Sequence, residues 1–195
     1  MGELQVITGC MYAGKTAELL RRVKREMIAG RKVQLFKPLI DSRYALNHVM
    51  THDKHGIEAI PVSDTRELIA FLNNPDVIAI DEVQFFDPAV IGFCLEQCKA
   101  GRTVICSALA TDFRGEPFTF RNSSLHIGDL LPHAVVTTLR AICTYRNEEG
   151  VICGKDADMT QRLIDGKPAS RDSPTVLIGG TDSYEARCRL HHDID

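Results

Sequence analysis

Residues 9–16, GCMYAGKT, match the phosphate-binding loop pattern G-x-x-x-x-G-K-[ST]. The apolar run ELQVIT at residues 3–8 predicts a buried strand that leads into this loop. From Lys15, apolar side chains recur at helical spacing, and Gly30 is a typical stop signal, so a helix should follow. A strand, a glycine loop and a helix in this order create a site where backbone N–H groups and a helix N-terminus surround a phosphate.

The pattern also assigns roles within the loop. The Lys15 ammonium would reach the β- and γ-phosphates of ATP, and the Thr16 hydroxyl would bind Mg²⁺. The alternative is a glycine-rich turn that merely precedes a helix, but the strand–loop–helix context favours nucleotide binding. The predicted nucleotide-binding residues are Gly9, Cys10, Met11, Tyr12, Ala13, Gly14, Lys15 and Thr16.

Strands and helices alternate through residue 142. This alternation predicts an α/β fold, a parallel sheet of the P-loop NTPase type with helices on both faces. Further strands are predicted at 32–38, 76–81 and 103–108, and helices at 64–72, after a capping box, and at 87–101.

The pattern changes after Ile142. Residues 143–195 contain hairpin-like pieces and potential metal ligands, so we divide the chain into a nucleotide-binding domain, 1–142, and a small second domain, 143–195. Residues 165–175, DGKPASRDSPT, predict a long loop, and long ordered loops often have a function.

Two acids stand at the end of the predicted strand 76–81. Asp81 lies where proteins with this glycine loop place a second acid near the magnesium ion. Glu82 is directed to the other side of the chain and could position a hydroxyl nucleophile and accept its proton. The alternative is that both acids only cap a strand end; the glycine loop favours the catalytic interpretation.

Five phenylalanines fall in two short stretches after predicted strands, where open α/β sheets bind ligands. An aromatic ring can stack on a nucleobase. Core packing is the better interpretation for any single ring, but we expect at least one of the five to line a ligand site. These residues are Phe85, Phe86, Phe113, Phe118 and Phe120.

The second domain holds a candidate metal site. Cys188 and His191 have a C-x₂-H spacing, and Cys143 and Cys153 flank a predicted hairpin with its turn at 147–150. Three thiolates and an imidazole would complete a tetrahedral zinc site. Two alternatives stay open: His192 could replace His191, or the thiols could be free.

The composition limits the possible partners. Hydrophobic residues make up 44% and charged residues 25%, and the formal net charge of −3 offers no basic footprint for duplex nucleic acid. No apolar run is long enough to span a bilayer. Seven unevenly spaced cysteines fit a cytoplasmic protein with reduced thiols and a metal better than a disulfide framework.

Taken together, the motifs resemble the type II, zinc-containing thymidine kinase family. They run in order from about Gln5 to His191 and are far more specific than the glycine loop alone, which unrelated P-loop enzymes share. The motifs are GCMYAGKT, DSRY at 41–44, THDK at 51–54, DEVQFF at 81–86, ALATDFRGEPF, TQRLIDG and IGGTDSYEARC.

The resemblance implies transfer of the γ-phosphate of ATP to the 5′-hydroxyl of deoxythymidine. Glu82 matches the general base, Asp81 and Gln84 match a second nucleotide-contacting segment, and Arg43 matches a phosphate-facing arginine. Residues 165–180 resemble the lasso loop that closes over the base through backbone hydrogen bonds. The implied nucleoside-binding residues are Met11, Asp41, Phe85, Phe113, Val176, Ile178, Gly179 and Tyr184.

The resemblance further implies magnesium at Thr16 and Asp81, structural zinc, a homotetramer and feedback inhibition by dTTP, with no nucleic-acid or membrane partner. The implied zinc ligands are Cys143, Cys153, Cys188 and His191. The chain departs from the family in its C-x₉-C spacing, where C-x₂-C is usual, and at Cys10 and Tyr12, where Pro and Phe are common.

Two other function classes remain open from the sequence. One is a P-loop ATPase or switch with a zinc module and no nucleoside acceptor, whose turnover would not depend on any nucleoside. The other is a zinc-containing nucleic-acid-binding protein with an ATPase core; the acidic charge balance disfavours it.

Overall fold

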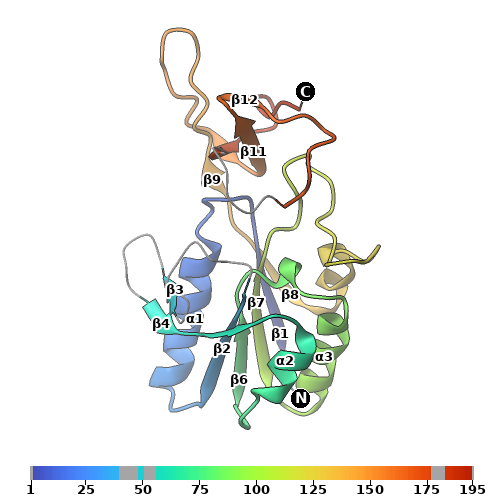
Figure 1. Cartoon of the computed structure of the whole chain (residues 1–195). Helices are drawn as coiled ribbons and strands as arrows, with labels where there is room; N and C mark the ends of the chain where they lie inside the picture. Colours follow the sequence, from blue (N-terminus) through green and yellow to red (C-terminus); the bar gives the residue numbers. More distant parts are fainter. Residues whose placement is uncertain (1, 40–47, 51–55, 177–182, 195) are drawn as a thin grey trace.

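The computed structural model describes residues 2–39, 48–50, 56–176 and 183–194. Its centre is a six-stranded sheet in which every pair of neighbouring strands is parallel (Figure 1). Parallel neighbours need crossover connections, which the helices supply. The strand order is β5 (Ile60–Val62), β2 (Val33–Pro38), β6 (Val77–Ile80), β7 (Thr103–Ala108), β1 (Leu4–Thr8) and β8 (Val135–Thr138).

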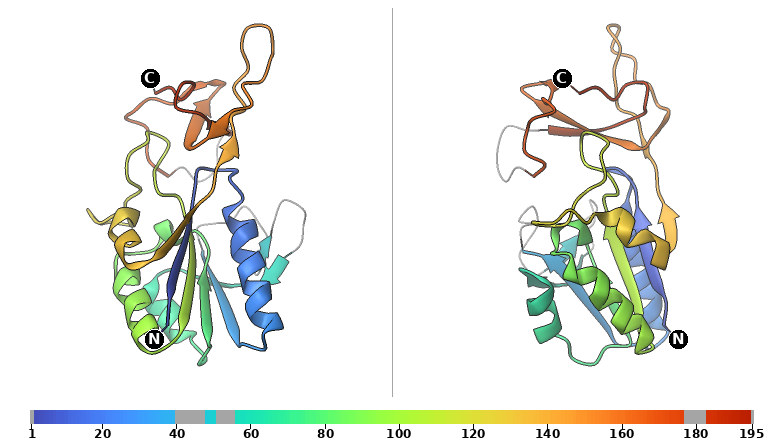
Figure 2. Two further views of the ribbon diagram at one scale, coloured as in Figure 1. Left: turned by 180° about the vertical axis from the view of Figure 1, so that it is seen from behind. Right: turned by 90° about the vertical axis from the view of Figure 1, so that its right-hand side faces the viewer.

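Helices cover both faces of this sheet. Helix α1 (Lys15–Ile28) lies on one face, and α2 (Thr65–Ala70) and α3 (Ala89–Lys99) lie on the other (Figures 1 and 2). This arrangement confirms the predicted α/β class with a parallel sheet of the P-loop type.

The sheet separates two hydrophobic clusters, and side chains alternate between them along each central strand. On β6, Ile78 and Ile80 pack with the side of α2 and α3, whereas Val77 and Ala79 pack with α1. All four are fully buried. Because successive side chains of a strand point to opposite faces, a strand buried on both faces must be apolar at every position.

The predicted elements of this layer are confirmed to within two residues at each end. The Asp64 cap is also confirmed: its carboxylate accepts the Glu67 N–H at 2.8 Å, while the Glu67 carboxylate accepts the N–H of Ser63. Helix α3 begins one residue later than expected, with Asp87 accepting the Ala89 N–H at 3.1 Å.

Strands β5 and β8 were not predicted. The first has only three residues, and the second lies at the edge of the sheet with Val135 55% exposed, so neither forms a buried apolar run. A hairpin of β3 (His48–Met50) and β4 (Gly56–Glu58) and three short 3₁₀ helices complete this part: η1 (Val83–Phe85), η2 (Ile127–Asp129) and η3 (Leu131–His133).

The C-terminal part lies beyond the carboxyl ends of the parallel strands (Figures 1 and 2). It contains two antiparallel sheets. Strand β9 (Ala141–Ile142) pairs with β10 (Asp156–Ala157), and β11 (Met159–Ile164) lies between β12 (Lys167–Pro168) and β13 (Ser183–Arg187).

The prediction of a loop over 165–175 is wrong for its first four residues. Asp165 and Gly166 have φ values of 50° and 78° and connect β11 to β12 as a two-residue hairpin turn. An Asp-Gly pair is favoured in such a turn because both central residues need positive φ. The loop therefore begins after Pro168.

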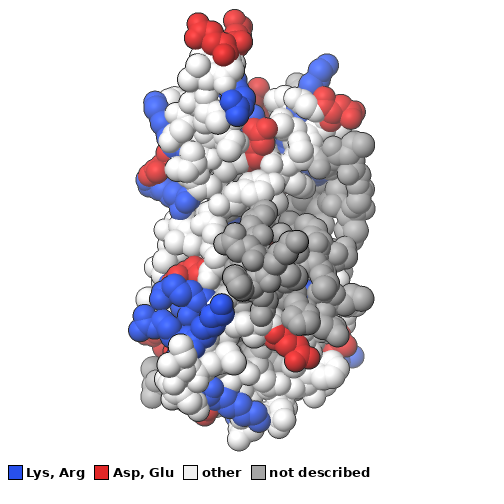
Figure 3. Space-filling view, turned by 90° about the vertical axis from the view of Figure 1, so that its left-hand side faces the viewer, with Lys and Arg blue, Asp and Glu red and all other residues white. Residues whose placement is uncertain are grey.

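Charged side chains of both signs are spread over the surface. Figure 3 views the side on which α1 lies: basic side chains gather over one part of this face, and acidic ones gather at the tip of the hairpin formed by residues 143–153. Within α1, hydrogen bonds from Arg21 lower the pKa of Glu18 to about 2, and Arg22 also pairs with this carboxylate at 2.8 Å.

No helix among the described residues has the length and apolar character to cross a membrane.

Candidate active site and metal centre

The glycine loop connects β1 to α1 at the carboxyl edge of the sheet. Gly14 has φ = 84° and precedes the first helical residue, and Gly9 has φ = 152°. A Cβ atom on Gly9 would lie 2.5 Å from the Leu139 carbonyl oxygen, so no larger residue fits there. Both glycines of the motif are therefore required by the backbone.

Lys15 and Thr16 begin α1 and are directed into the site. The buried Lys15 ammonium donates a hydrogen bond to the Cys10 carbonyl at 2.9 Å, across its own loop. The Thr16 hydroxyl lies 3.2 and 3.3 Å from the two carboxylate oxygens of Asp81, which directly follows β6. The structure thus brings together the two residues predicted to bind magnesium, and hydroxyl and carboxylate oxygens suit this hard cation.

Ser107, a residue that the sequence analysis missed, joins the two acids at the end of β6. It lies on β7, between the strand of the glycine loop and the strand of the acids, and is fully buried. Its hydroxyl donates to the Asp81 carboxylate and accepts the backbone N–H of Glu82 at 3.0 Å. A serine inside the apolar run TVICSA carries no sequence signal of this role.

Glu82 has an unusual backbone conformation. Its φ of 50° lies in the left-handed region, where a non-glycine residue costs about 1–3 kcal/mol and which is common at functional sites. The buried Gln84 amide donates to the Glu82 carboxylate, and the Gln84 carbonyl oxygen accepts the Leu109 N–H at 3.1 Å. The carboxylate is therefore fixed in direction beside Asp81.

The phenylalanines divide into two groups. Phe86, Phe118 and Phe120 belong to the hydrophobic core, as the core interpretation expects, and Phe85 packs on that core with its ring edge-to-face with Phe118 at 5.6 Å. Phe113 is buried outside this cluster, with the Arg114 guanidinium carbon 4.3 Å from its ring centroid.

Other residues predicted to bind the nucleoside lie at the junction of the two parts. The Met11 N–H donates to the Thr160 hydroxyl of β11 at 3.0 Å, and Met11 packs on the core. Tyr184 lies on β13, and Val176 is exposed after the loop. The predicted residues Asp41, Arg43, Ile178 and Gly179 lie outside the described residues.

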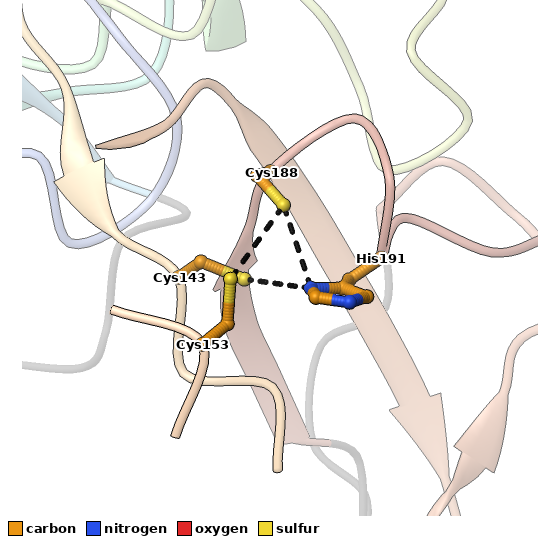
Figure 4. Close-up of side chains that lie close together, drawn as sticks. All are labelled: Cys143, Cys153, Cys188 and His191. Atoms are coloured by element: carbon orange, nitrogen blue, oxygen red, sulfur yellow. Dashed lines mark hydrogen bonds between the residues drawn. The ribbon is translucent and has the colours of Figure 1, made fainter. Parts of the chain in front are cut away.

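Three thiols and an imidazole converge at the base of the hairpin 143–153. The ligand atoms of Cys143, Cys153, Cys188 and His191 all lie within 4.8 Å of one another (Figure 4). The Nδ1 atom of His191 is 3.7 Å from the Cys143 sulfur and 3.5 Å from the Cys188 sulfur, and the sulfurs of Cys153 and Cys188 are 4.0 Å apart.

These separations fit a tetrahedral metal. Sulfur at about 2.3 Å and nitrogen at about 2.0–2.1 Å from zinc would place the ligand atoms about 3.5–3.8 Å apart. Although desolvation opposes ionisation, backbone N–H groups of Leu190 and His191 hold the pKa of the Cys188 thiol below its ordinary value. The donor set and its geometry therefore suit zinc.

Neighbouring residues fix the imidazole and exclude the alternative ligand. The Tyr145 ring stacks on His191, with centroids 4.1 Å apart and planes at 18°. His192 turns away from the thiols, and its Nε2 lies 2.8 Å from the Phe113 carbonyl oxygen.

The long C-x₉-C spacing is accommodated by a hairpin. In this hairpin the Asn147 N–H donates to the Val151 carbonyl at 3.1 Å, and the Gly150 N–H donates to the Asn147 carbonyl at 2.9 Å.

The glycine loop packs directly against the cluster of three cysteines and His191. Cys10 belongs to the same buried cluster as Cys143 and Cys188, and its sulfur lies 3.4 Å from the Ala157 carbonyl oxygen. Burial raises the pKa of the Cys10 thiol above its ordinary value, so the group stays a neutral donor. Cys10 therefore forms a contact between the two parts of the chain.

A glycine loop at β1, an acid pair at β6 and a Cys₃His centre beyond them define a P-loop nucleotide-binding protein with an attached metal module. The family model described as thymidine kinase matches residues 2–192. The chain belongs to the thymidine kinase family.

The comparison with curated proteins agrees with this membership. The thymidine kinase of Coprothermobacter proteolyticus is 42% identical over 193 residues, which cover 99% of this chain and 91% of that protein. Among solved structures, the ATPase DotB of Legionella pneumophila gives a TM-score of 0.40 at 16% identity, over 76% of this chain and 42% of the other.

The Ser107 hydrogen bonds give a first prediction. Ser107→Ala removes the partner of the Asp81 carboxylate and of the Glu82 N–H, so the free energy of unfolding should fall by about 1–3 kcal/mol. Chemical denaturation measures this change. Ser183→Ala, at an exposed position of β13, is the control and should have little effect. Equal stability of the two variants would mean that the buried network contributes nothing.

Proposed function

We propose that this protein transfers the γ-phosphoryl group of ATP to the 5′-hydroxyl of thymidine and so produces dTMP. Membership of the family supports the reaction class. The observation that carries the proposal is the arrangement at the end of β6, where Asp81 contacts Thr16 of the glycine loop and the carboxylate of the next residue, Glu82, is held by Gln84. A nucleotide site and a candidate base are thus adjacent.

The glycine loop holds the triphosphate in this proposal. Backbone N–H groups of residues 9–16 and the N-terminus of α1 attract the phosphate oxygens. The Lys15 ammonium donates a hydrogen bond to the Cys10 carbonyl. A charged phosphate oxygen binds an ammonium group more strongly than a neutral carbonyl does, so Lys15 can leave Cys10 and bind the triphosphate. Thr16 and Asp81 would hold Mg²⁺, which neutralises charge on the transferring phosphoryl group when bound.

Glu82 is the proposed general base. Its carboxylate orients the 5′-hydroxyl toward the phosphoryl group and takes the hydroxyl proton as the new O–P bond forms. Gln84 binds the side-chain carboxylate of Glu82, and Ser107 binds its backbone N–H, so both the side chain and the backbone are held in place.

The nucleoside would lie between the two parts of the chain. Phe113 and Phe85 follow the central strands, while Tyr184 projects from the opposing antiparallel sheet. An aromatic pocket suits the flat face of thymine. A close-fitting slot would also accept the 5-methyl group and exclude larger substituents, because one misplaced methylene costs about 1–3 kcal/mol. The other proposed contacts are Met11, Asp41, Val176, Ile178 and Gly179, with Arg43 and Gln84 on the nucleotide side.

Zinc at Cys143, Cys153, Cys188 and His191 would have a structural role, because all four positions of a tetrahedral site are filled by protein atoms.

We further propose the division into domains 1–142 and 143–195. A homotetramer, inhibition by dTTP and a cytoplasmic location are proposed from the resemblance to the family alone.

ATP consumption with Mg²⁺, in the presence of thymidine, deoxycytidine or deoxyadenosine, tests the reaction. We expect turnover only with thymidine, with dTMP as the product. Turnover that is the same with every nucleoside, or with none, would instead identify an ATPase without a nucleoside acceptor.

Substitution of the proposed base separates chemistry from binding. Glu82→Gln keeps the size and an acceptor oxygen for Gln84 but removes the base, so kcat should fall by about 10²–10⁴ with thymidine affinity retained. Steady-state kinetics and calorimetry measure the two quantities. The control is Glu96→Gln on the exposed face of α3. A near-normal kcat in Glu82→Gln would mean that Glu82 is not the general base.

Metal removal tests the zinc centre. Elemental analysis should find close to one zinc ion per chain. Chelation should lower both the thermal midpoint and thymidine affinity, because the centre fixes the strand and hairpin next to the proposed pocket. Cys153→Ser should reproduce the loss, whereas Cys98→Ser, which changes a thiol outside the cluster, should not. Fully active protein without zinc would contradict this role.

A further inference from the structure

Two buried arginines lie over the ring of Phe113. The guanidinium carbons of Arg114 and Arg162 are 4.3 and 5.3 Å from its centroid. The Arg114 side chain is 13% exposed, and Arg162 is completely buried. Removing a guanidinium group from water is costly unless its N–H donors find partners. The partners therefore indicate what these side chains are for.

Arg114 uses its donors mainly on one short segment, residues 171–175. Its Nε donates to the Arg171 carbonyl at 2.6 Å, its Nη1 to the Thr175 hydroxyl at 3.0 Å, and its Nη2 to the Ser173 carbonyl. Nη1 also donates to the buried Asp112 carboxylate, which offsets the cationic charge.

Arg162 reaches the same segment from the other side. It lies on β11, and its Nη1 donates to the Pro174 carbonyl at 2.7 Å. On the neighbouring strand β13 it is paired with Tyr184, whose ring centroid is 6.0 Å from its guanidinium carbon. One side chain thus contacts the loop and two aromatic residues of the proposed nucleoside pocket, Phe113 and Tyr184.

The segment has little structure of its own. Among the described residues of 170–176, the one backbone–backbone hydrogen bond joins the Ser173 N–H to the Ser170 carbonyl at 2.9 Å. The two arginines instead bind three successive parts of its main chain, at Arg171, Ser173 and Pro174. Its path is therefore set by side chains from two other places in the chain, Arg114 in the segment after β7 and Arg162 on β11.

We propose that Arg114 and Arg162 are positioning residues for the nucleoside. They hold residues 171–175 in place with guanidinium groups that also lie over Phe113, a residue of the proposed pocket. The inference rests on the proposed thymidine site. Since the glycine loop is held through other residues of the C-terminal part, Ala157 and Thr160, the loss of the arginine contacts should weaken the use of thymidine and leave the use of ATP unchanged.

Arg114→Lys is the main test. A lysine retains the charge beside Asp112 but cannot form the planar fork that binds several acceptors at once. KM for thymidine should rise by about 10–100-fold, as expected for the loss of charge-assisted hydrogen bonds, while KM for ATP stays within about twofold. Arg162→Lys should show the same separation.

Two further variants control this test. Arg171→Ala keeps the carbonyl that Arg114 binds but removes an exposed ion pair between the Arg171 and Glu116 side chains, so kinetics should stay within about twofold of the native protein. The double variant Asp112→Asn/Arg114→Gln leaves no unpaired buried charge. It should fold and show the same thymidine defect, which distinguishes the loop contacts from a general loss of stability.

Hydrogen exchange of a peptide covering residues 169–176 gives a readout without catalysis. Exchange should be faster in Arg114→Lys than in Arg171→Ala or the native protein, before any ligand is added. Unchanged exchange, a parallel rise of both KM values, or an equal defect in Arg171→Ala would overturn the proposal. If the native protein used no thymidine at all, the proposed function would fail, and the exchange experiment would still decide whether the arginines hold the loop.

Discussion

The site depends on one buried carboxylate. Asp81 is 4% exposed and lies between the hydroxyls of Thr16 and Ser107, so three separate chain segments meet on a single charged group. A buried carboxylate is costly unless hydrogen bonds compensate it, and both hydroxyls contribute to this compensation. This requirement fixes the end of β6 relative to the glycine loop and to β7. The acid thus aligns the site in which it is the proposed magnesium ligand.

The same constraint explains the backbone of Glu82. With Asp81 and the Glu82 N–H both bound to Ser107, the chain turns sharply after β6, and Glu82 takes the positive φ that few side chains adopt. Two consecutive carboxylates then face different partners, Asp81 toward the glycine loop and Glu82 toward Gln84. In a regular strand, alternation alone would have sent one of them into a hydrophobic cluster.

Much of this architecture follows from local patterns, and the remainder depends on contacts that no local pattern contains. The glycine loop, the apolar strands and the metal ligands could be predicted because their residue types have few other uses at those spacings. Ser107 and Arg162 could not, since a serine or an arginine within a strand has no signature until its partner is known. The Asp165-Gly166 turn did have a local signature, but the polar residues after it suggested one continuous loop. Edge strand β8 was not predicted because its exposed side chains do not alternate clearly with buried ones.

The C-terminal part supports the glycine loop. Cys10 and Met11 contact it through the Ala157 carbonyl and the Thr160 hydroxyl, respectively, so the side of the loop away from the phosphate site rests on β10 and β11. Residues of the same part also reach this region: Arg162 of β11 lies over the Phe113 ring, and the loop after β12 accepts hydrogen bonds from Arg114. A shift of this part would therefore move both the support of the glycine loop and the residues around Phe113 that line the proposed nucleoside pocket. A metal bound by the Cys₃His cluster at its base would be a physical means of preventing that shift, because it would join the hairpin 143–153 to the end of β13 without adding flexible chain.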